Sequence, residues 1–378
     1  MVESIASIAA TAPVPVRSPD PPLLLAEMRP EQRAALLAAK LRSLVAGTWR
    51  RDASGLEPTL FPAGAGLVDP TDRIGWVLVH PVSVERDPDD LTFDTTPQLP
   101  RGWLGGAIQW GARHNVSALH ILADDLGGAD ARKAAHFADP PTLWKVTGRD
   151  AVVVAPTPYV DPPDPDPVSL LFADTIEAAG ADVVIEHGVV RGEVLGLEVA
   201  RVVPDFEGVP QLEVGVGRHD RLAQAMLYGT ADVETSLRTA IAAVLEHRRP
   251  HAGPHPANQL APERWLRHIL GCRPETIVLE SLSPVPGTLA PRLKRPAPAM
   301  AIGTRAYGLP SAVVACSVGV DLDSVADAAD ARLVRAAGSP LWLVLPYGDD
   351  LPALRSLAAR LAMPADVVTV PRAWRDIA

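Results

Sequence analysis

The stretch LEVARVVPDFEGVPQLEVGVGRHDR, from Leu197 to Arg221, contains two apolar runs on either side of a short turn. Apolar residues that alternate with other residues are typical of a β-strand with one buried face. Each predicted strand carries a lone glutamate among its apolar residues, Glu198 in the first and Glu213 in the second. The stretch therefore predicts a hairpin that turns at Pro204–Gly208 and carries two carboxylates on neighbouring strands.

Length and composition limit the class of protein. The 378 residues exceed what one hydrophobic core usually supports, so two or three domains, or one large core with additions, are expected. A content of 47% hydrophobic and 21% charged residues indicates a globular chain. No apolar run reaches the roughly 18 residues of a membrane span, and the acidic third residue does not fit a signal peptide. We therefore expect a cytoplasmic protein that does not associate with membranes.

Strands and helices alternate along most of the chain, which predicts the α/β class. The prolines between Ala155 and Ser169 prevent regular structure and indicate a linker. No segment recurs at a fixed period, so a solenoid is not expected. The predicted divisions are a flexible leader with an N-terminal helix over residues 1–69, an α/β domain over 70–156, a Pro/Asp-rich linker over 157–169, and a second α/β domain with a C-terminal extension over 170–378.

The predicted order of elements from Leu170 to Tyr228 is helix, strand, strand, turn, strand and helix. This order resembles the core of the PD-(D/E)XK, or restriction-endonuclease-like, nucleases over about 60 residues. In that family an acidic residue on one strand and a (D/E)xK triplet on the next hold a divalent metal ion. Glu198 matches the first acid and Glu213 begins the matching triplet. The resemblance implies that both are catalytic residues that bind Mg²⁺ or Mn²⁺, with Asp205 in the turn as a further ligand.

The chemistry of such a pair is well defined. Mg²⁺ and Mn²⁺ prefer carboxylate oxygens, and a bound ion lowers the pKa of its water and neutralises charge on the phosphate under attack. The chain departs from the family at the lysine of the triplet, because Gly215 stands there. Arg201, Arg218 and His219 are the nearby candidates to replace that lysine. Without a replacement, the fold is expected to survive as an inactive relative, with the two glutamates on a solvated face of the sheet.

Basic residues concentrate in one segment although the whole chain has a net charge of −10. Residues 236–306 hold ten Arg and Lys against four Asp and Glu, a net charge of +6. Arginines bind the phosphates of nucleic acids, so this segment predicts a nucleic-acid-binding face. The residues assigned to that face are Arg248, Arg249, Arg264 and Arg292.

The remaining polar motifs each allow two interpretations. His247, His251 and His255 are four residues apart, which is a metal-ligand spacing on a helix, but the prolines and glycine among them favour a basic loop. Asp321 and Asp323 follow a predicted strand, where they fit either a ligand site or the cap of the next helix, and capping is favoured. Asp124 follows another strand and allows the same two interpretations. The two cysteines form no CxxC pair.

The predicted fold is thus an α/β protein with a restriction-endonuclease-like core and additional, Rossmann-like α/β units. The leading functional prediction is a divergent, metal-dependent nuclease-like protein that acts on or binds nucleic acid. The alternative is a non-catalytic α/β scaffold or regulatory protein that binds another protein or a small ligand. The oligomeric state, including a homo-oligomer, stays open.

Overall fold

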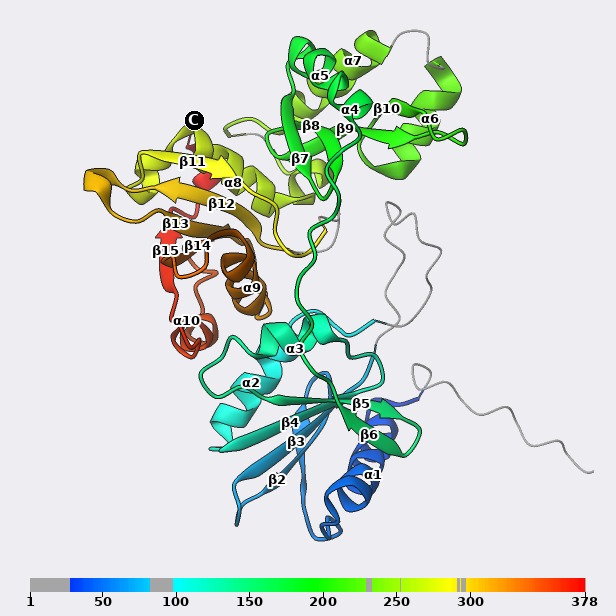
Figure 1. Ribbon diagram of the computed structural model, residues 1–378, viewed down its shortest axis with the longest axis vertical. Helices are drawn as coiled ribbons and strands as arrows, with labels where there is room; N and C mark the ends of the chain where they lie inside the picture. Colours follow the sequence, from blue (N-terminus) through cyan, green and yellow to red (C-terminus); the bar gives the residue numbers. More distant parts are fainter. Residues whose placement is uncertain are drawn as a thin grey trace, which may run out of the picture.

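Three β-sheets, each with its own helices, follow one another along the long axis of the molecule (Figure 1). The computed structural model describes residues 28–81, 98–228, 233–251, 253–290, 293 and 297–377. Helices accompany all three sheets, so the α/β class predicted from the sequence is confirmed. We call the three parts the N-terminal, middle and C-terminal units, after their order in the sequence.

The N-terminal unit is built on a six-stranded sheet of order β1-β2-β3-β4-β5-β6. Its elements are α1 (Pro30–Trp49), β1 (Pro58–Phe61), β2 (Gly64–Asp69), β3 (Ile74–Val79), α2 (Trp103–Arg113), β4 (Ala118–Ala123), α3 (Gly128–Ala134), β5 (Thr142–Thr147) and β6 (Asp150–Val153). The Ala- and Leu-rich helix α1 buries Leu37, Leu41 and Leu44 in the core on one face of the sheet, and α2 and α3 cover the other face. Because α1, β1 and β2 belong to this unit, it begins well before the predicted boundary at residue 70.

The C-terminal unit has a five-stranded sheet of order β11-β12-β13-β14-β15. Its elements are α8 (Pro262–Cys272), η3 (Pro274–Ile277), β11 (Ser281–Pro284), β12 (Ala299–Thr304), η4 (Ala306–Gly308), β13 (Ala312–Cys316), α9 (Ser324–Ala336), β14 (Leu341–Pro346), α10 (Pro352–Ala359), β15 (Asp366–Val370) and η5 (Trp374–Asp376). Successive strands pair antiparallel, antiparallel, parallel and parallel, as β1 to β5 do. The two units therefore share one topology, although the sequence shows no repeat of fixed period.

The contacts between these two units are reciprocal. In the shared topology, α9 corresponds to α2 and α10 corresponds to α3. Across the interface, α2 packs on α10 and α3 packs on α9. The Ala138 amide donates a hydrogen bond to the Arg360 carbonyl (2.9 Å), and the Ala362 amide donates one to the His136 carbonyl (2.8 Å). A single hydrophobic core includes the inner faces of both sheets. The two units are thus arranged as an internal pseudo-dimer.

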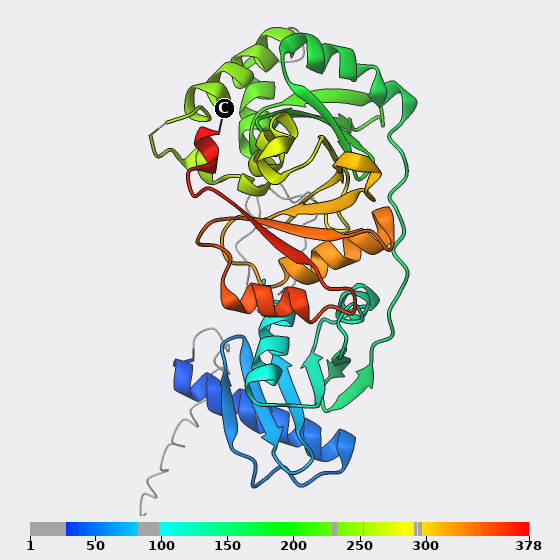
Figure 2. The same ribbon diagram turned by 90° about the vertical axis from the view of Figure 1, so that its left-hand side faces the viewer.

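The middle unit is an antiparallel sheet of order β10-β9-β8-β7. Its elements are α4 (Pro167–Leu170), α5 (Phe172–Ala179), β7 (Asp182–Glu186), β8 (Val189–Val194), β9 (Leu197–Pro204), β10 (Pro210–Val214), α6 (Gly217–Tyr228), α7 (Val233–His247) and η2 (Pro256–Gln259). Helices α5 and α7 contact the sheet and share its core. Residues 154–166 form no helix or strand and pass along the side of the C-terminal unit to reach the middle unit (Figure 2).

The predicted second domain, residues 170–378, is divided between the middle and C-terminal units. The sequence interpretation also missed β8, which lies between β7 and β9. The turns on both sides of β8 place His187, Gly188, Leu195 and Gly196 at positive φ, the conformation of tight hairpin turns. The residues on which the restriction-endonuclease-like core rests form an antiparallel sheet. The restriction-endonuclease-like core itself stays a prediction.

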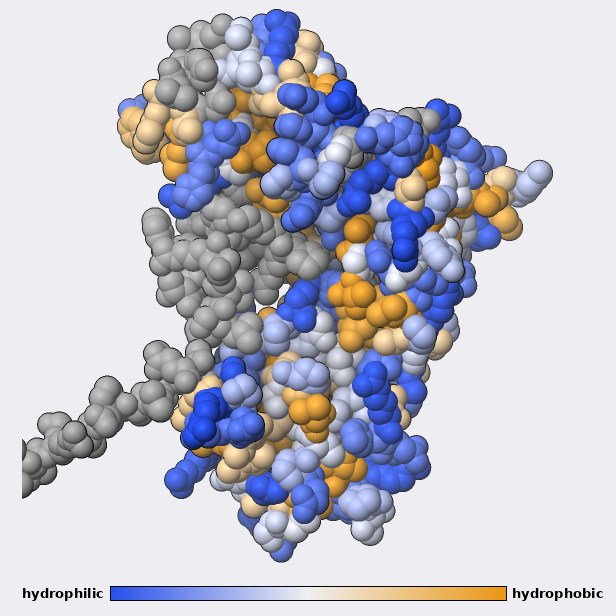
Figure 3. Space-filling model, turned by 180° about the vertical axis from the view of Figure 1, so that it is seen from behind, coloured by the Kyte–Doolittle hydropathy of each residue, from blue (hydrophilic) through white to orange (hydrophobic). Residues whose placement is uncertain are grey.

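Polar and charged side chains cover much of the surface, and apolar side chains gather at mid-height on the face seen in Figure 3. None of the helices in the described part of the chain combines the length and the hydrophobicity of a membrane span.

Candidate functional site

The two predicted metal ligands lie close together, but arginines surround them. The carboxylate of Glu198 contacts Arg191 (2.9 Å), Arg201 (2.5 Å) and Arg221 (3.4 Å). Glu213 contacts the same Arg221 at 3.3 Å. The structure thus brings both glutamates to one guanidinium group, that of Arg221.

This arrangement does not favour a cation. Three guanidinium groups already neutralise Glu198, and they would repel a divalent ion. Asp205 accepts hydrogen bonds from the amides of Glu207 and Val209 and so orders the turn. It lies seven residues along from Glu198, roughly 20 Å for an extended strand, too far to share an ion. Within the described residues, no group of three or more His, Cys, Asp and Glu side chains is arranged to hold a metal.

Gly215, at the position of the family's lysine, is required by the backbone. Its φ is +136°, and an added Cβ would lie 2.7 Å from the amide nitrogen of Arg221. A side chain there would collide with the first turns of α6. Of the predicted substitutes for the lysine, Arg201 contacts Glu198.

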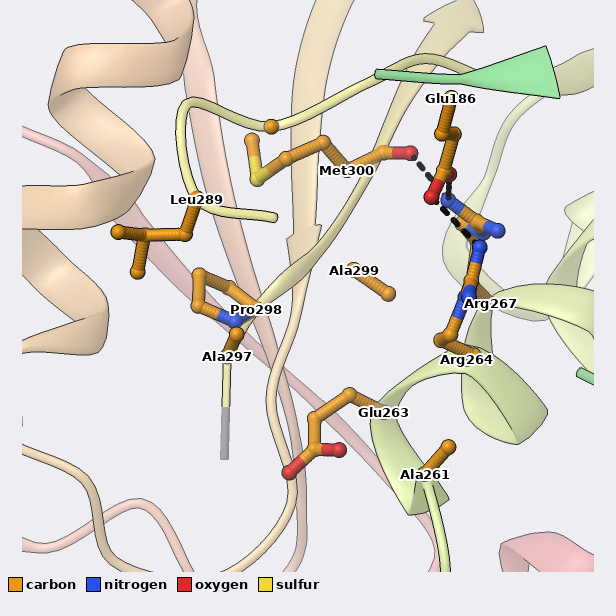
Figure 4. Close-up of a pocket in the computed structure, with 11 residues that line it drawn as sticks. Glu186, Ala261, Glu263, Arg264, Arg267, Leu289, Ala297, Pro298, Ala299 and Met300 are labelled. Atoms are coloured by element: carbon orange, nitrogen blue, oxygen red, sulfur yellow. Dashed lines mark hydrogen bonds and ion pairs between the residues drawn. The ribbon is translucent and has the colours of Figure 1, made fainter. Parts of the chain in front are cut away.

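Arg264, predicted to face nucleic acid, lies inside the protein. It pairs with Glu186 (2.5 Å) and Glu193 (2.6 Å), and its neighbour Arg267 pairs with Glu186 (2.8 Å; Figure 4). Burial alone would raise the pKa of Glu186, but Arg264 and Arg267 lower it to about 2. These pairs join β7 and β8 of the middle unit to α8 of the C-terminal unit, so Arg264 has a structural role.

Arg248 is also buried, which corrects its predicted place on the same face. Its guanidinium donates hydrogen bonds to the carbonyls of Leu195 (2.8 Å), Ala257 (3.0 Å) and Leu260, and it stacks on Trp265. Burial lowers its pKa to about 9. A guanidinium with these partners is not available to a phosphate. Arg249 is exposed, whereas Arg292 lies outside the described residues.

The three histidines of the predicted basic loop do not converge. The rings of His247 and His255 stack 3.6 Å apart. His251 turns away and contacts Asp376 at 3.4 Å. His247 ends α7, and His251 and His255 lie after it outside any helix.

Four buried aspartates around the start of α9 bind the N-terminal unit. Asp330 forms a bidentate pair with Arg132 (2.8 and 2.9 Å), and Asp327 contacts Lys133 at 2.8 Å. Asp321 contacts Arg101 at 2.7 Å, and Arg101 also reaches Asp327. The fourth aspartate is Asp323. The acidic surface of one unit thus meets the basic side chains of the other.

Asp323 caps a helix of the other unit. Its carboxylate accepts hydrogen bonds from the amides of Gly102 (2.8 Å) and Gly105 (2.9 Å) at the start of α2. A carboxylate satisfies the free amides of a helix N-terminus and is favoured by the helix dipole. Burial raises the pKa of Asp323 to about 6. Capping was the favoured prediction, but the capped helix is α2 and not α9.

A cavity of about 450 Å³ lies between the two units of the pseudo-dimer. One wall is a face of α2 that presents Trp103, Gly106 and Trp110. The opposite walls come from the β1–β2 turn and, in the C-terminal unit, from the residues after β13 and the start of α10. Their lining residues are Leu60, Phe61, Pro62, Ala63, Val320, Leu322 and Ala353. We call this cavity the inter-unit cleft.

Few polar side chains reach the inter-unit cleft. They are Arg101, Gln109, Arg113 and Asp321. Arg101 and Asp321 pair with each other, and the side-chain amide of Gln109 donates to the Ala353 carbonyl (2.9 Å). Arg101 and Trp103 also line a second cavity of about 320 Å³, which Lys133, Asp130 and Asp323 border.

No sequence motif pointed to the inter-unit cleft. The predicted helix around residues 102–115 already showed Trp and Gly at helical spacing, which fits a helix that another chain segment or a ligand approaches closely. The opposite walls come from residues about 40 positions earlier and from residues more than 200 positions later, so only the fold reveals the cavity.

Comparisons with known proteins identify no relative: no protein-family model matches the chain, and no curated protein or solved structure is significantly similar to it.

Proposed function

We propose that the protein is a non-catalytic binding protein that holds a small, largely apolar molecule in the inter-unit cleft. The cleft itself carries the proposal. Ligand pockets typically measure about 300–1,000 Å³, are concave and mostly apolar, and lie between domains. The cleft has about 450 Å³, an apolar lining with a few polar side chains, and walls from two units.

The charged residues of the chain support a binding role over catalysis. Glu198 is held by three arginines, and Arg248 and Arg264 are buried with partners of their own. Arg248 and Arg264 join the middle and C-terminal units, and the Glu198 pairs stabilise the middle unit itself. Such pairs are costly to disturb, since a buried charge without its partner is strongly unfavourable.

Gly106 offers a direct way to close the cleft. It lies in α2, and an added Cβ would meet only Phe61, at 3.9 Å, which is an ordinary contact. The Cβ of Gly106→Leu therefore fits without collision, and the rest of the leucine side chain would occupy space in the cavity. Leucine also favours a helix more than glycine does, by about 1 kcal/mol, so the variant should fold.

The test uses the neutral fluorescent probe N-phenylnaphthylamine. The wild-type protein should bind it saturably, and Gly106→Leu should abolish that binding. The matched control is Gly47→Leu in α1, which also replaces a glycine inside a helix; Gly47 is exposed, and its added Cβ would have no neighbour within 4 Å. Gly47→Leu should bind as the wild type does. Equal binding by all three proteins would mean that the probe occupies some other surface.

The nuclease-like function stays a prediction with its own test. Calorimetric titration of the metal-free protein with Mn²⁺, beside Glu198→Ala and Glu213→Ala, measures metal binding without a known substrate. Saturable binding that both variants abolish would support the nuclease-like function against the binding role proposed above.

A further inference from the structure

The volume of the inter-unit cleft limits the size of its ligand. An apolar cavity of about 150 Å³ accommodates one benzene molecule. At about 450 Å³, the cleft has room for a body of two or three rings. A larger folded or polymeric partner would not fit inside it.

Aromatic side chains determine the shape of the preferred ligand. Phe61, Trp103 and Trp110 line the cleft and are all buried. Flat rings pack favourably on such side chains in stacked or edge-to-face arrangements. An aromatic ligand would therefore gain ring contacts that an aliphatic one lacks.

The charges of the cleft favour an anion. Arg101 pairs with Asp321 and also with Asp327, so its charge is already neutralised. Arg113, by contrast, is exposed and forms no ion pair or hydrogen bond with the described residues. Among the described residues, one positive charge without an ion pair thus borders an apolar cavity. A single anionic group on the ligand would pair with Arg113, whereas Arg113 would repel a cationic ligand.

We infer that the inter-unit cleft selects aromatic monoanions of two or three rings, with Arg113 as the residue that recognises the anionic group. This inference rests on the proposed function, because it assigns a ligand class to the same cavity. Arginine suits carboxylate and sulfonate groups, since its planar guanidinium presents several donors to their oxygens.

The test compares two fluorescent probes that share one three-ring body. Anilinonaphthalene sulfonate carries an anionic group that N-phenylnaphthylamine lacks. Arg113→Gln should weaken binding of the sulfonate about fivefold, the effect of losing one partly exposed ion pair. Binding of the neutral probe should stay within about twofold of the wild type. Added salt should reduce the difference between wild type and Arg113→Gln for the sulfonate.

Arg149→Gln is the matched control, because Arg149 is an exposed arginine in the β5–β6 turn, outside the cleft. It makes the same change in net charge and should leave both affinities unchanged. If Gly106→Leu fails to reduce binding of either probe, the cleft is not a binding site and the proposed function fails. If Gly106→Leu blocks both probes but Arg113→Gln acts no more strongly than Arg149→Gln, the cleft binds ligands without selecting anions, and the inference alone is overturned.

Discussion

Phe137 and Leu361 face each other across an isolated antiparallel bridge, and each occupies the same place in its own unit. Phe137 follows α3 and lies five residues before β5, and Leu361 follows α10 and lies five residues before β15. Residues that pair with their own counterparts mark the axis of a two-fold arrangement. The inter-unit cleft is therefore a feature of an interface within one chain, and the stability of that interface controls whether the cleft exists.

Removal of the buried charge pair at this interface should be costly. Asp330→Ala leaves Arg132 buried without its partner and should lower the free energy of unfolding by about 3–5 kcal/mol. Urea denaturation measures this loss. The control is Asp350→Ala, which breaks the partly exposed pair with Arg355 and should cost less than about 1 kcal/mol. Similar small losses for both variants would show that the Arg132–Asp330 pair does not hold the units together.

The two predicted catalytic glutamates should differ in their effect on stability. The Glu198 side chain is 12% exposed and has three arginine partners, whereas Glu213 is 40% exposed. Glu198→Ala should therefore cost about 3 kcal/mol, and Glu213→Ala less than about 1 kcal/mol. Thermal unfolding of both variants checks this difference. If both variants lost equally little stability, the result would fit the alternative, a metal site without its ion, in which the two carboxylates repel each other.

Gly215 should tolerate no side chain. Gly215→Ala suffers both a positive φ and the close approach to α6, and it should destabilise the protein by about 3 kcal/mol. Gly208 also has a positive φ, of +84°, but no neighbour within 4 Å. Gly208→Ala should therefore cost only about 1 kcal/mol. Chemical denaturation of the two variants separates backbone strain from the steric clash, and equal costs would contradict the clash.

Glu263 should make stability depend on pH. Burial raises its pKa from 4.5 to about 7 in the folded protein. Below pH 4.5 the carboxyl is neutral in both the folded and unfolded states, so it costs nothing. As the pH rises from 4.5 to about 7, the carboxyl ionises in the unfolded state but stays neutral in the folded state, which lowers the free energy of unfolding. Stability contributed by the neutral carboxyl is therefore lost between these values.

Glu263→Gln should remove this dependence. Relative to the wild type, the variant should gain about 2–3 kcal/mol of unfolding free energy between pH 4.5 and pH 8. Urea denaturation of both proteins at several pH values measures the difference, in which the other titrating groups cancel. A constant difference across this range would mean that Glu263 ionises normally.

The sequence predicted the local elements better than their assembly. Apolar periodicity identified α1, β3 and the β9–β10 hairpin, because each has one buried face or is wholly buried. It missed β8, since the pairs His187-Gly188 and Leu195-Gly196 gave a weak turn signal. The shared topology of the two units was also hidden, because their connecting segments differ in length.

The candidate site was harder to predict, for a physical reason. A charged residue in a sequence does not show whether its partner is solvent or a side chain far along the chain. Arg264 pairs with Glu186 and Glu193, more than 70 residues earlier, and the basic segment therefore suggested a surface where the structure has an interior. The cleft lining is likewise assembled from four segments that are distant in the sequence, none of which has a recognisable motif.

Fluorine NMR of protein labelled with fluorotryptophan tests most directly whether the cleft between the two units binds a ligand. The chain has eight tryptophans, of which Trp103 and Trp110 line the cleft, whereas Trp265 of α8 packs on Trp374 of η5. Phenylalanine variants of these four assign their resonances. Addition of N-phenylnaphthylamine should shift the Trp103 and Trp110 signals and leave those of Trp265 and Trp374 in place. Saturable binding that leaves Trp103 and Trp110 unshifted would contradict a ligand site in the inter-unit cleft.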